Sequence, residues 1–504
     1  MNLQRANASS GPSFRSNVAA NYFGKLWSFV SVYAFVPLYI HFLGISAYGL
    51  IAFHAVALAI LFIADAGLSA TFTREAARET DPNKLRTLLT SVERILLCIL
   101  GVAVVAMFLS AEWMLTVWLR PSGALDATVA LQCLQMMPFA LAPQVLMSLY
   151  FGGLMGLQKQ VSANAWTTLF SMARSGLVVL PIAFWPDPRV FFAWQVLVCG
   201  MSAWLLRSAL LRALRGGAGK ASFSWSALKD IRAYAAGMLA MSVISGLNTQ
   251  LDRLVVSKLR PLEEFSYYFL AGTLAQIPYL LTMPIALALL PRLTALKARA
   301  EERPLTRLYE LNSYGIAALA STAGFALFFF APEAIDLWLP QRDIPAIIPR
   351  VMQLLAIGGI LLALQLAPFQ LSLANGHNRT NVLLGLVVLI VSVPAQIVLT
   401  MQHGLLGAAL PWLGLNAIAF IYLGVALNRR FYAGRVGRWF LLFAAVPVVV
   451  SFVALATARG AASSMNLAPL ASCAVATVGC VLALVASAGI WRVMSTQRND
   501  MGHV

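Results

Sequence analysis

Long apolar stretches separated by short polar connections fill nearly the whole chain of 504 residues. A helix needs about 20 mainly apolar residues to cross the hydrocarbon core of a bilayer. Fourteen stretches meet this length, at approximately 17–40, 44–70, 88–109, 125–155, 162–185, 190–212, 231–258, 264–290, 308–330, 346–374, 380–401, 405–428, 437–458 and 467–491. The pattern predicts an all-α polytopic membrane protein with about 14 transmembrane helices and no separate water-soluble domain.

The composition supports this prediction, and the distribution of charge orients the helices. Hydrophobic residues make up 60% of the chain and charged residues 11%, with a formal net charge of +17. Lys and Arg of membrane proteins concentrate in cytoplasmic connections. If the N-terminus lies inside, most of the 36 Lys and Arg fall in inner segments, among them Arg74, Arg78, Lys84, Arg86, Arg207, Arg212, Arg292, Lys297, Arg429 and Arg430. We therefore expect both termini on the cytoplasmic side, membrane lipids around the chain, and no nucleic-acid partner, because aromatic residues do not interleave with the basic ones.

An internal repeat divides the chain into two similar parts. Segment 43–48 enters the second expected helix as 262–268 enters the eighth, Arg74 matches Arg292, and 156–160 matches 376–379, each about 219 residues apart. The Gly-rich basic segment 215–220 is the best linker candidate. We expect an N-lobe of six helices at 1–215, a C-lobe of six helices at 216–430, and an appended helix pair with the C-terminal tail at 431–504. An even helix number per lobe gives both lobes the same orientation, as in transporters with parallel repeats.

The sequence contains no pattern that indicates catalysis or a cofactor. The five cysteines all fall in apolar spans without CxxC spacing, and the five histidines do not stand with acidic residues at metal-ligand spacing. The phosphate-binding pattern GxxxxGK[ST] is absent from the sequence, so we do not expect ATP hydrolysis by the chain itself. We expect no metal, no cofactor, no catalytic residues and no enzymatic activity.

Two basic residues within the apolar spans are candidates for binding an anion. A charge at bilayer depth costs about 2.5–3.5 kcal/mol on insertion scales, so each one needs a reason. Lys25 lies about one third into the first span, with Asn21 one turn earlier on the same face. Lys25 either extends to the inner headgroups or faces an internal cavity. Arg174 lies in the middle of the span 162–185, where it either faces a cavity or pairs with a carboxylate.

Other intramembrane polar residues cluster on the spans 44–70, 231–258 and 264–290. Asn248 and Asp252 are four residues apart and share a helix face, and Asp252 could pair with the adjacent Arg253 or with another helix. Gln276 lies in the next span. Asp65, near the inner end of its span, either binds a coupling cation or proton or braces the basic connection that follows it.

The order of several short motifs resembles a known family. NYFG stands at 21–24 and VPLYI at 36–40, followed by ADAGL at 64–68 and TREAAR at 73–78. GLQ follows at 156–158, LDR at 251–253 and FSYY at 265–268. Over about residues 15–430 the chain resembles the polysaccharide-exporting (Wzx-type) flippases for lipid-linked oligosaccharides. These belong to the superfamily of multidrug, oligosaccharidyl-lipid and polysaccharide exporters.

The resemblance implies two six-helix lobes around a positively charged cavity. It also implies a bacterial inner-membrane protein that moves undecaprenyl-diphosphate-linked oligosaccharide, an O-antigen, capsule or exopolysaccharide unit, from the cytoplasmic to the periplasmic leaflet by alternating access. Lys25, Arg174 and Arg253 would then be the cavity cations, with Asn21, Asn248 and Gln276 as further substrate-binding residues and Asp65 and Asp252 as ion-coupling candidates. Other polysaccharide-assembly proteins would be candidate partners.

Two other functions compete with this one. A cation-coupled multidrug exporter has the same architecture, but extruders of cationic drugs are expected to favour acidic cavities, and this chain has at least as many buried cations as anions. A membrane-embedded polysaccharide polymerase or ligase would need a sizeable outer loop with catalytic or phosphate-binding residues, whereas every expected outer loop is short.

The charge distribution makes a direct prediction about topology. A cysteine introduced as Gly217→Cys lies in the linker that we expect inside, so a thiol reagent that does not cross membranes should fail to label it in right-side-out cells. Permeabilised cells should restore the labelling. Ready labelling of intact cells would show that the linker faces outward.

Overall fold

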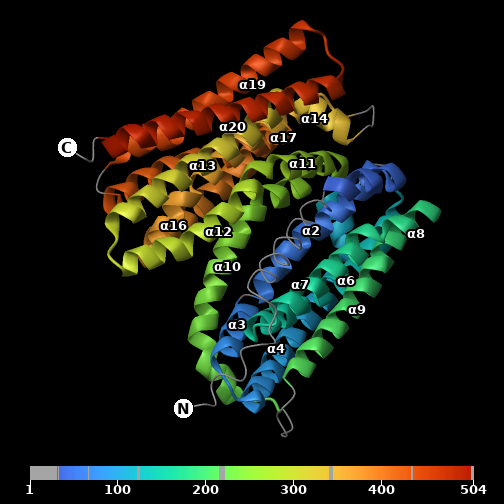
Figure 1. Cartoon of the computed structure of the whole chain (residues 1–504). Coiled ribbons are helices and arrows are strands. Elements are labelled where there is room, and N and C mark those ends of the chain that lie inside the picture. Colours follow the sequence, from blue (N-terminus) through green and yellow to red (C-terminus); the bar gives the residue numbers. More distant parts are fainter. Residues whose placement is uncertain are drawn as a thin grey trace, which may run out of the picture. The chain divides into compact units, whose positions relative to one another are not determined.

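The computed structural model describes residues 31, 33–65, 67–121, 125–214, 222–339, 344–432 and 435–500, and these residues are almost entirely helical. A short apolar helix, Tyr33–Leu43, precedes α2. The elements that follow are α2 (Ile45–Asp65), α3 (Leu68–Arg78), α4 (Pro82–Leu109), α5 (Ala111–Trp113), η1 (Met114–Leu119), α6 (Ala127–Gly156), α7 (Gln160–Ser171), η2 (Met172–Gly176), α8 (Val179–Phe184), α9 (Pro188–Ala213), α10 (Trp225–Leu259), α11 (Leu262–Ala275), α12 (Ile277–Ala298), α13 (Glu302–Phe329), α14 (Ala331–Trp338), α15 (Ile348–Leu364), α16 (Leu366–Ala374), α17 (Arg379–Phe431), α18 (Val436–Arg438), η3 (Trp439–Ala445), α19 (Val446–Ser464) and α20 (Pro469–Asp500) (Figure 1).

The predicted all-α polytopic membrane fold is confirmed. In the described part of the chain, eleven helices are long and apolar enough to cross a membrane. One of them, α17, joins two helices across a kink at Gly404. The first expected span, 17–40, lies mostly outside the described residues, so the total of fourteen stays a prediction.

The chain forms two compact units. Unit 1 comprises 1–250 and 260–266, and unit 2 comprises 251–259 and 267–504. In unit 1, α6 packs against α2, α3, α4 and α9 (Figure 1). In unit 2, α13 packs against α12, α15, α19 and α20. The predicted domain limits at 215 and 430 stay predictions.

The element order repeats along the chain with nearly constant spacing. Helix α4 begins at Pro82 and α13 at Glu302, a separation of 220 residues, and both helices have 28 residues. Helix α7 begins at Gln160 and α17 at Arg379, 219 residues later. The spacing that the short motifs indicated therefore recurs in the starting positions of these helices.

Aspartates at helix starts fix where several unit 1 helices begin. The Asp81 carboxylate accepts from the backbone N–H of Asn83 at 2.8 Å at the start of α4, and Asp187 accepts from Arg189 N–H at 2.8 Å at the start of α9. Asp126 accepts from Thr128 N–H at 2.6 Å at the start of α6, and this backbone bond lowers the pKa of the Asp126 carboxyl. Such caps satisfy N–H groups that have no partner inside the helix.

Several predicted continuous spans are interrupted. The expected span 44–70 ends at Asp65, and α3 starts a new helix after Gly67, whose φ of +87° suits glycine. A Cβ at position 67 would lie 2.3 Å from Cβ of Met238, so close packing on α10 also requires glycine there. The spans 264–290 and 346–374 break at Gln276 and Gln365, where α11 gives way to α12 and α15 to α16.

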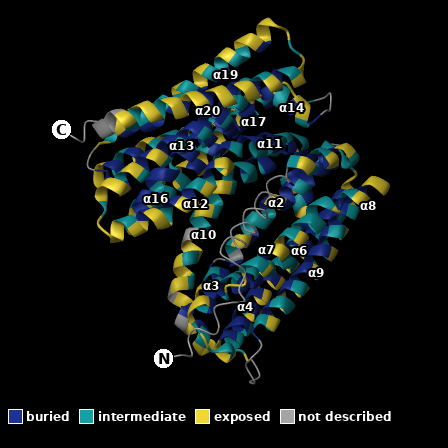
Figure 2. Ribbon diagram, viewed as in Figure 1, coloured by how far each residue is buried: buried dark blue, intermediate teal, exposed yellow. Residues whose placement is uncertain are grey.

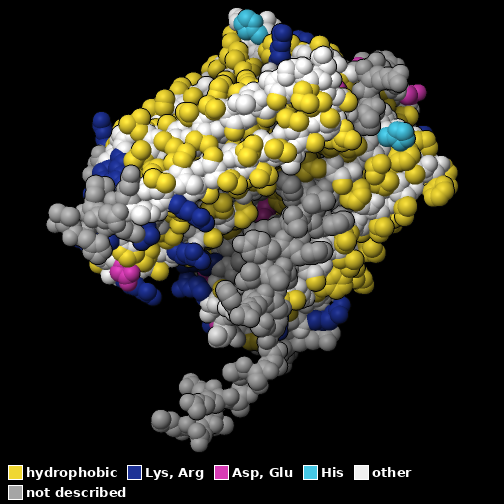
Figure 3. Space-filling model, turned by 45° about the horizontal axis from the view of Figure 1, so that its top comes forward, with side chains coloured by type: hydrophobic (Ala, Val, Ile, Leu, Met, Phe, Trp, Pro, Cys, Tyr) yellow, Lys and Arg dark blue, Asp and Glu magenta, His cyan; other side chains and the backbone are white. Residues whose placement is uncertain are grey.

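Apolar side chains face outward over much of the surface, as expected for lipid contact. On α4, Val102, Val105 and Leu109 are 71%, 57% and 75% exposed. Helices α19 and α20 show the same mixture of exposed and buried faces (Figure 2). Figure 3 shows hydrophobic side chains spread widely over the visible surface. An aqueous protein of this size would not leave so much apolar surface uncovered.

A buried polar cluster connects three helices of unit 1. Glu93 of α4, 7% exposed, accepts from Arg207 Nε of α9 at 2.5 Å and from Arg207 Nη2 at 3.1 Å. The hydroxyl of Tyr150 on α6 donates to Glu93 Oε1 at 2.5 Å. From the sequence we counted Arg207 only as a topology-setting charge, but it also compensates a buried carboxylate.

Residues after 431 pack on α13 of unit 2. Trp439 Nε1 donates to Ser313 Oγ at 3.1 Å, and the Tyr314 hydroxyl donates to the Ser487 carbonyl at 2.9 Å. Arg459 of α19 pairs with Glu333 of α14. The last helices are thus connected to unit 2 by polar bonds as well as by apolar packing.

The Glu93 cluster predicts an effect on stability. Arg207→Ala should lower the free energy of unfolding by about 1–3 kcal/mol, because it leaves the Glu93 carboxylate buried without its cation. The measurement is the thermal unfolding midpoint in detergent. Arg189→Ala is the matched control: its partner Asp187 is on an exposed connection, so the midpoint should hardly change. Equal midpoints for both variants would contradict this account of the cluster.

Candidate functional site

The predicted site residues divide between the two units. Lys25 and Asn21 lie outside the described residues. Asp65, Arg174 and Asn248 belong to unit 1. Asp252, Arg253 and Gln276 belong to unit 2.

Arg174 lies in a π-helical turn inside a membrane-crossing segment. The turn η2 separates α7 from α8, and together they form the apolar segment Gln160–Phe184. A π-helical turn changes the backbone hydrogen-bond pattern and is frequent at functional sites. Side chains from neighbouring helices bond to the carbonyls of this turn. Trp194 Nε1 donates to the Ala173 carbonyl at 2.9 Å, Gln195 Nε2 donates to that of Arg174 at 3.0 Å, and the Tyr39 hydroxyl donates to that of Ser175.

The Arg174 guanidinium meets an amide instead of a carboxylate. Its Nη1 donates to Oε1 of Gln144 on α6 at 2.5 Å. Gln144 Nε2 in turn lies 3.0 Å from the Ala140 carbonyl and 3.3 Å from Nε2 of His54 on α2. Among the described residues, no Asp or Glu is at ion-pair distance from Arg174, and its side chain is half-buried. Most of its five N–H donors are therefore available to an anion.

Gln144 and His54 are polar contacts that we did not predict from the sequence. Both are buried, at 8% and 6% exposure, and both stand alone in apolar spans. Their polarity at membrane depth was a usable signal, by the same reasoning that selected Arg174. Only the packing of α2, α6 and η2 brings the three side chains together.

Asp65 connects the end of α2 to α3 and α6. Its Oδ1 accepts from Ser69 Oγ at 2.6 Å and from Ser69 N at 3.3 Å, and its Oδ2 accepts from Ser148 Oγ at 2.7 Å. Asp65 is 8% exposed. These contacts suit the bracing role that the sequence left open beside ion coupling.

In unit 2, Asp252 and Arg253 have different partners. The Tyr268 hydroxyl lies 3.0 Å from Asp252 Oδ2 and 3.3 Å from the Ala408 carbonyl. The Arg253 guanidinium lies over the Phe269 ring, 4.7 Å from its centroid. No ion pair joins Asp252 to Arg253, because adjacent residues on a helix point in different directions.

Asn248 and Gln276 each form a hydrogen bond with a backbone group four residues away in the chain. Asn248 Nδ2 donates to the Ile244 carbonyl, one turn earlier on α10, at 2.9 Å. Gln276 is half-buried at the junction between α11 and α12, where its carbonyl accepts from Leu280 N–H at 3.0 Å. A substrate-binding role for Asn248 and Gln276 stays a prediction.

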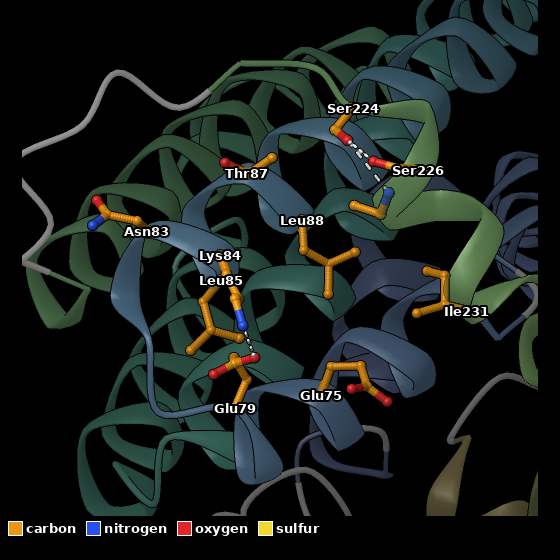
Figure 4. Close-up of a pocket in the computed structure, with 11 residues that line it drawn as sticks. Glu75, Glu79, Asn83, Lys84, Leu85, Thr87, Leu88, Ser224, Ser226 and Ile231 are labelled. Atoms are coloured by element: carbon orange, nitrogen blue, oxygen red, sulfur yellow. Dashed lines mark hydrogen bonds and ion pairs between the residues drawn. The ribbon is translucent and has the colours of Figure 1, made fainter.

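A pocket of about 420 Å³ lies at the end of unit 1 where α3 meets α4 and α10 begins (Figure 4). Its polar lining residues are Glu75, Glu79, Asn83, Lys84, Thr87, Ser224 and Ser226. Lys84 Nζ lies 3.5 Å from Glu79 Oε2, and the two serine hydroxyls lie 2.7 Å apart. None of the predicted site residues lines this pocket. The described residues also contain no group of three or more His, Cys, Asp or Glu that could hold a metal ion.

Comparisons with known proteins identify the family and the fold. The family model described as "Polysaccharide biosynthesis protein" matches residues 14–297, which is more than half of the chain. A comparison with curated protein sequences gave no match. Among solved structures, the chain is similar to "Lipid II flippase MurJ, inward closed conformation", with a TM-score of 0.72 and 13% identity over 94% of this chain and 98% of that one.

Two multidrug transporters have the same fold. An inward-facing multidrug resistance MATE family transporter of the MOP superfamily matches with a TM-score of 0.67 and 14% identity, over 84% of this chain and 98% of that one. The MATE multidrug transporter DinF-BH matches with a TM-score of 0.57 and 16% identity, over 82% of this chain and 95% of that one. At these identities the likeness concerns the fold alone.

The contacts of Asp65 predict which of its two roles it has. Asp65→Asn should lower the free energy of unfolding by about 1–3 kcal/mol, since the amide NH₂ replaces an acceptor for the serine hydroxyls. Ser148→Ala should give a smaller loss, because the bonds to Ser69 remain. Asp336→Asn, at an exposed position of α14, is the control and should leave the thermal midpoint unchanged. Unchanged stability of Asp65→Asn together with lost transport would favour ion coupling over bracing.

Proposed function

Because the chain belongs to the polysaccharide biosynthesis protein family, we propose that it is a flippase for lipid-linked oligosaccharides. Its substrate would be an oligosaccharide on undecaprenyl diphosphate, an O-antigen, capsule or exopolysaccharide unit. The protein would move this substrate from the cytoplasmic to the periplasmic leaflet of a bacterial inner membrane by alternating access. Both termini would lie in the cytoplasm. The fold, shared with a flippase and with transporters, supports transport in preference to catalysis.

The proposed substrate makes three separate demands on its carrier. The sugars need a hydrated path, the diphosphate needs cations, and the isoprenoid chain needs lipid. A helical membrane protein can offer polar side chains inside and an apolar surface outside. The exposed apolar faces of this chain meet the last demand.

The observation that carries the proposal is the state of Arg174. A half-buried guanidinium in a membrane-crossing segment, without a carboxylate partner among the described residues, has no internal charge compensation. Its planar fork of donors fits phosphate oxygens, and in a partly dry site the attraction is stronger than in water. We assign Arg174 the contact with the diphosphate. Arg253, whose guanidinium packs on an aromatic ring, is a second candidate.

The remaining substrate-binding assignments rest on residue type and position. Lys25 would add a cation, and Asn21, Asn248 and Gln276 would hydrogen-bond to sugar or phosphate. Net export needs a driving force, from an ion gradient or from consumption of the product outside. Asp252 is the better candidate for ion coupling, because the contacts of Asp65 suit a brace.

A cation-coupled multidrug exporter is the second candidate, favoured by the fold likeness to MATE transporters. The two functions differ in the charge that they need at the binding site. An arginine without a carboxylate partner repels a cationic drug, so Arg174, which has none among the described residues, favours an anionic substrate. An exporter of cations would lose activity on removal of Asp252 and keep it on removal of Arg174.

Replacement of Arg174 tests the proposed function. Arg174→Ala should abolish polysaccharide export while the protein remains in the membrane at its normal level. Arg174→Lys should retain part of the activity, since Lys keeps the charge but loses the planar fork. The measurement is complementation of a deletion strain, with surface polysaccharide and membrane protein quantified together.

Arg350→Ala provides the control for this series. Arg350 is exposed in the first turn of α15, so its loss should not affect export. Full complementation by Arg174→Ala would remove Arg174 from the binding site.

A further inference from the structure

The side-chain amide of Gln144 contacts both Arg174 and His54, so it can connect a change at one residue to the other. Its Oε1 accepts from Arg174 Nη1 at 2.5 Å, so its Nε2 is a donor and faces Nε2 of His54 at 3.3 Å. A donor at this position requires His54 Nε2 to be unprotonated, with the imidazole neutral and its proton on Nδ1. The two bonds form one directed chain from the guanidinium to the imidazole.

His54 lacks the partner that would fix its protonation state. Its Nδ1 is buried and has no hydrogen-bond partner among the described residues. Imidazoles with a structural or metal-binding role usually have this second nitrogen bonded to a carboxylate, carbonyl or water. Without such a bond, the protonation of His54 depends on its burial, on Gln144 and on the charges nearby.

Of the groups near His54, Arg174 carries the charge that acts on the imidazole. Phe192 of α9 lies edge-on, with ring centroids 5.8 Å apart. Gln144 faces His54 from α6. Burial disfavours a positive charge on His54, and the nearby Arg174 is the ionised group that adds to this effect. Tyr39 and Cys199 are the titratable groups that adjoin Arg174. Asp65 follows three turns later on α2, with its carboxylate bonded to Ser69 and Ser148.

We propose that His54 binds a proton when the anionic headgroup of the substrate binds at Arg174, so that translocation is linked to proton uptake. This inference rests on the proposed function, because it takes Arg174 as the phosphate contact. An anion on Arg174 offsets the positive charge that disfavours a second cation at His54. By thermodynamic reciprocity, a proton on His54 strengthens binding of the anion.

A turn of the Gln144 side-chain amide would connect protonation of His54 to the contacts of Arg174. In the imidazolium both nitrogens are donors, so Gln144 must turn its Oε1 toward His54. Its NH₂ group then faces the Arg174 guanidinium, to which it cannot donate. Arg174 thus loses the amide acceptor that holds its Nη1 and can turn its donors to phosphate.

Proton uptake on binding is the direct test. The probe is a short-chain isoprenyl diphosphosugar, titrated into the purified full-length protein in buffers of different ionisation enthalpy. The wild-type protein should take up protons on binding, approaching one per ligand in the pH range where His54 titrates, and there its affinity should rise by up to about tenfold per pH unit on acidification. His54→Gln keeps an acceptor for Gln144 but cannot be protonated, so it should bind the probe without proton uptake. His403→Gln, at an exposed position of α17, should behave like the wild type.

Gln144→Glu tests the relay itself. A carboxylate there satisfies Arg174 and a protonated His54 together, so affinity for the probe should fall at least about tenfold and proton uptake should vanish. If His54→Gln does not fold, nitrogen NMR of the His54 ring reports its protonation directly. The sample is a variant in which the other four histidines are replaced by Gln. The His54 signals should change from the neutral to the imidazolium form when the probe is added.

The outcomes separate this inference from the proposed function. Binding without proton uptake in the wild type, or uptake that persists in His54→Gln, would overturn the role of His54 and leave the substrate class intact. Failure of the wild-type protein to bind the probe would overturn the substrate class and, with it, the link to His54.

Discussion

The proposed role of Arg174 depends on one constraint: a guanidinium at membrane depth must be compensated. Insertion of an arginine at the bilayer centre costs about 2.5–3.5 kcal/mol, and proteins usually recover this with a carboxylate. Unit 1 does so at Glu93, which holds Arg207 with two hydrogen bonds. Among the residues that the structure describes, Arg174 instead has a neutral amide as its partner, which leaves its charge available to a ligand. This difference distinguishes Arg207, which compensates a buried carboxylate, from Arg174, for which we propose a binding role.

The local fold explains how such a residue is tolerated. The π-helical turn around Arg174 would leave backbone carbonyls without partners, and Trp194, Gln195 and Tyr39 donate to them. Two of these donors come from α9 and one from the helix Tyr33–Leu43. Neighbouring helices therefore hold the turn in place, and a change in their packing would alter the position of Arg174. Such a site suits a protein that must bind its substrate and then release it.

The sequence predicted the architecture well because apolar length and charge asymmetry are strong signals in membrane proteins. The starts of α4 and α13, 220 residues apart, agree with a repeat first seen in short motifs. The break at Gly67 was not predicted, because it depends on the approach of Met238, which is distant in sequence. Arg174 was found from its depth alone. Gln144 and His54 were missed because each appears as a lone polar residue, and only tertiary packing makes them neighbours of Arg174. The pairing of Asp252 with Arg253 looked plausible in sequence, but helix geometry directs the two side chains to different partners.

The central claim is that this chain carries a lipid-linked diphosphate sugar across the membrane. The most direct test is the leaflet distribution of undecaprenyl-diphosphate-linked sugar in cells that lack the protein, measured with a sugar-modifying reagent that cannot cross the inner membrane. The account predicts that the lipid-linked sugar accumulates on the cytoplasmic leaflet, protected from the reagent. Appearance of this sugar on the periplasmic leaflet at the normal rate would contradict the account.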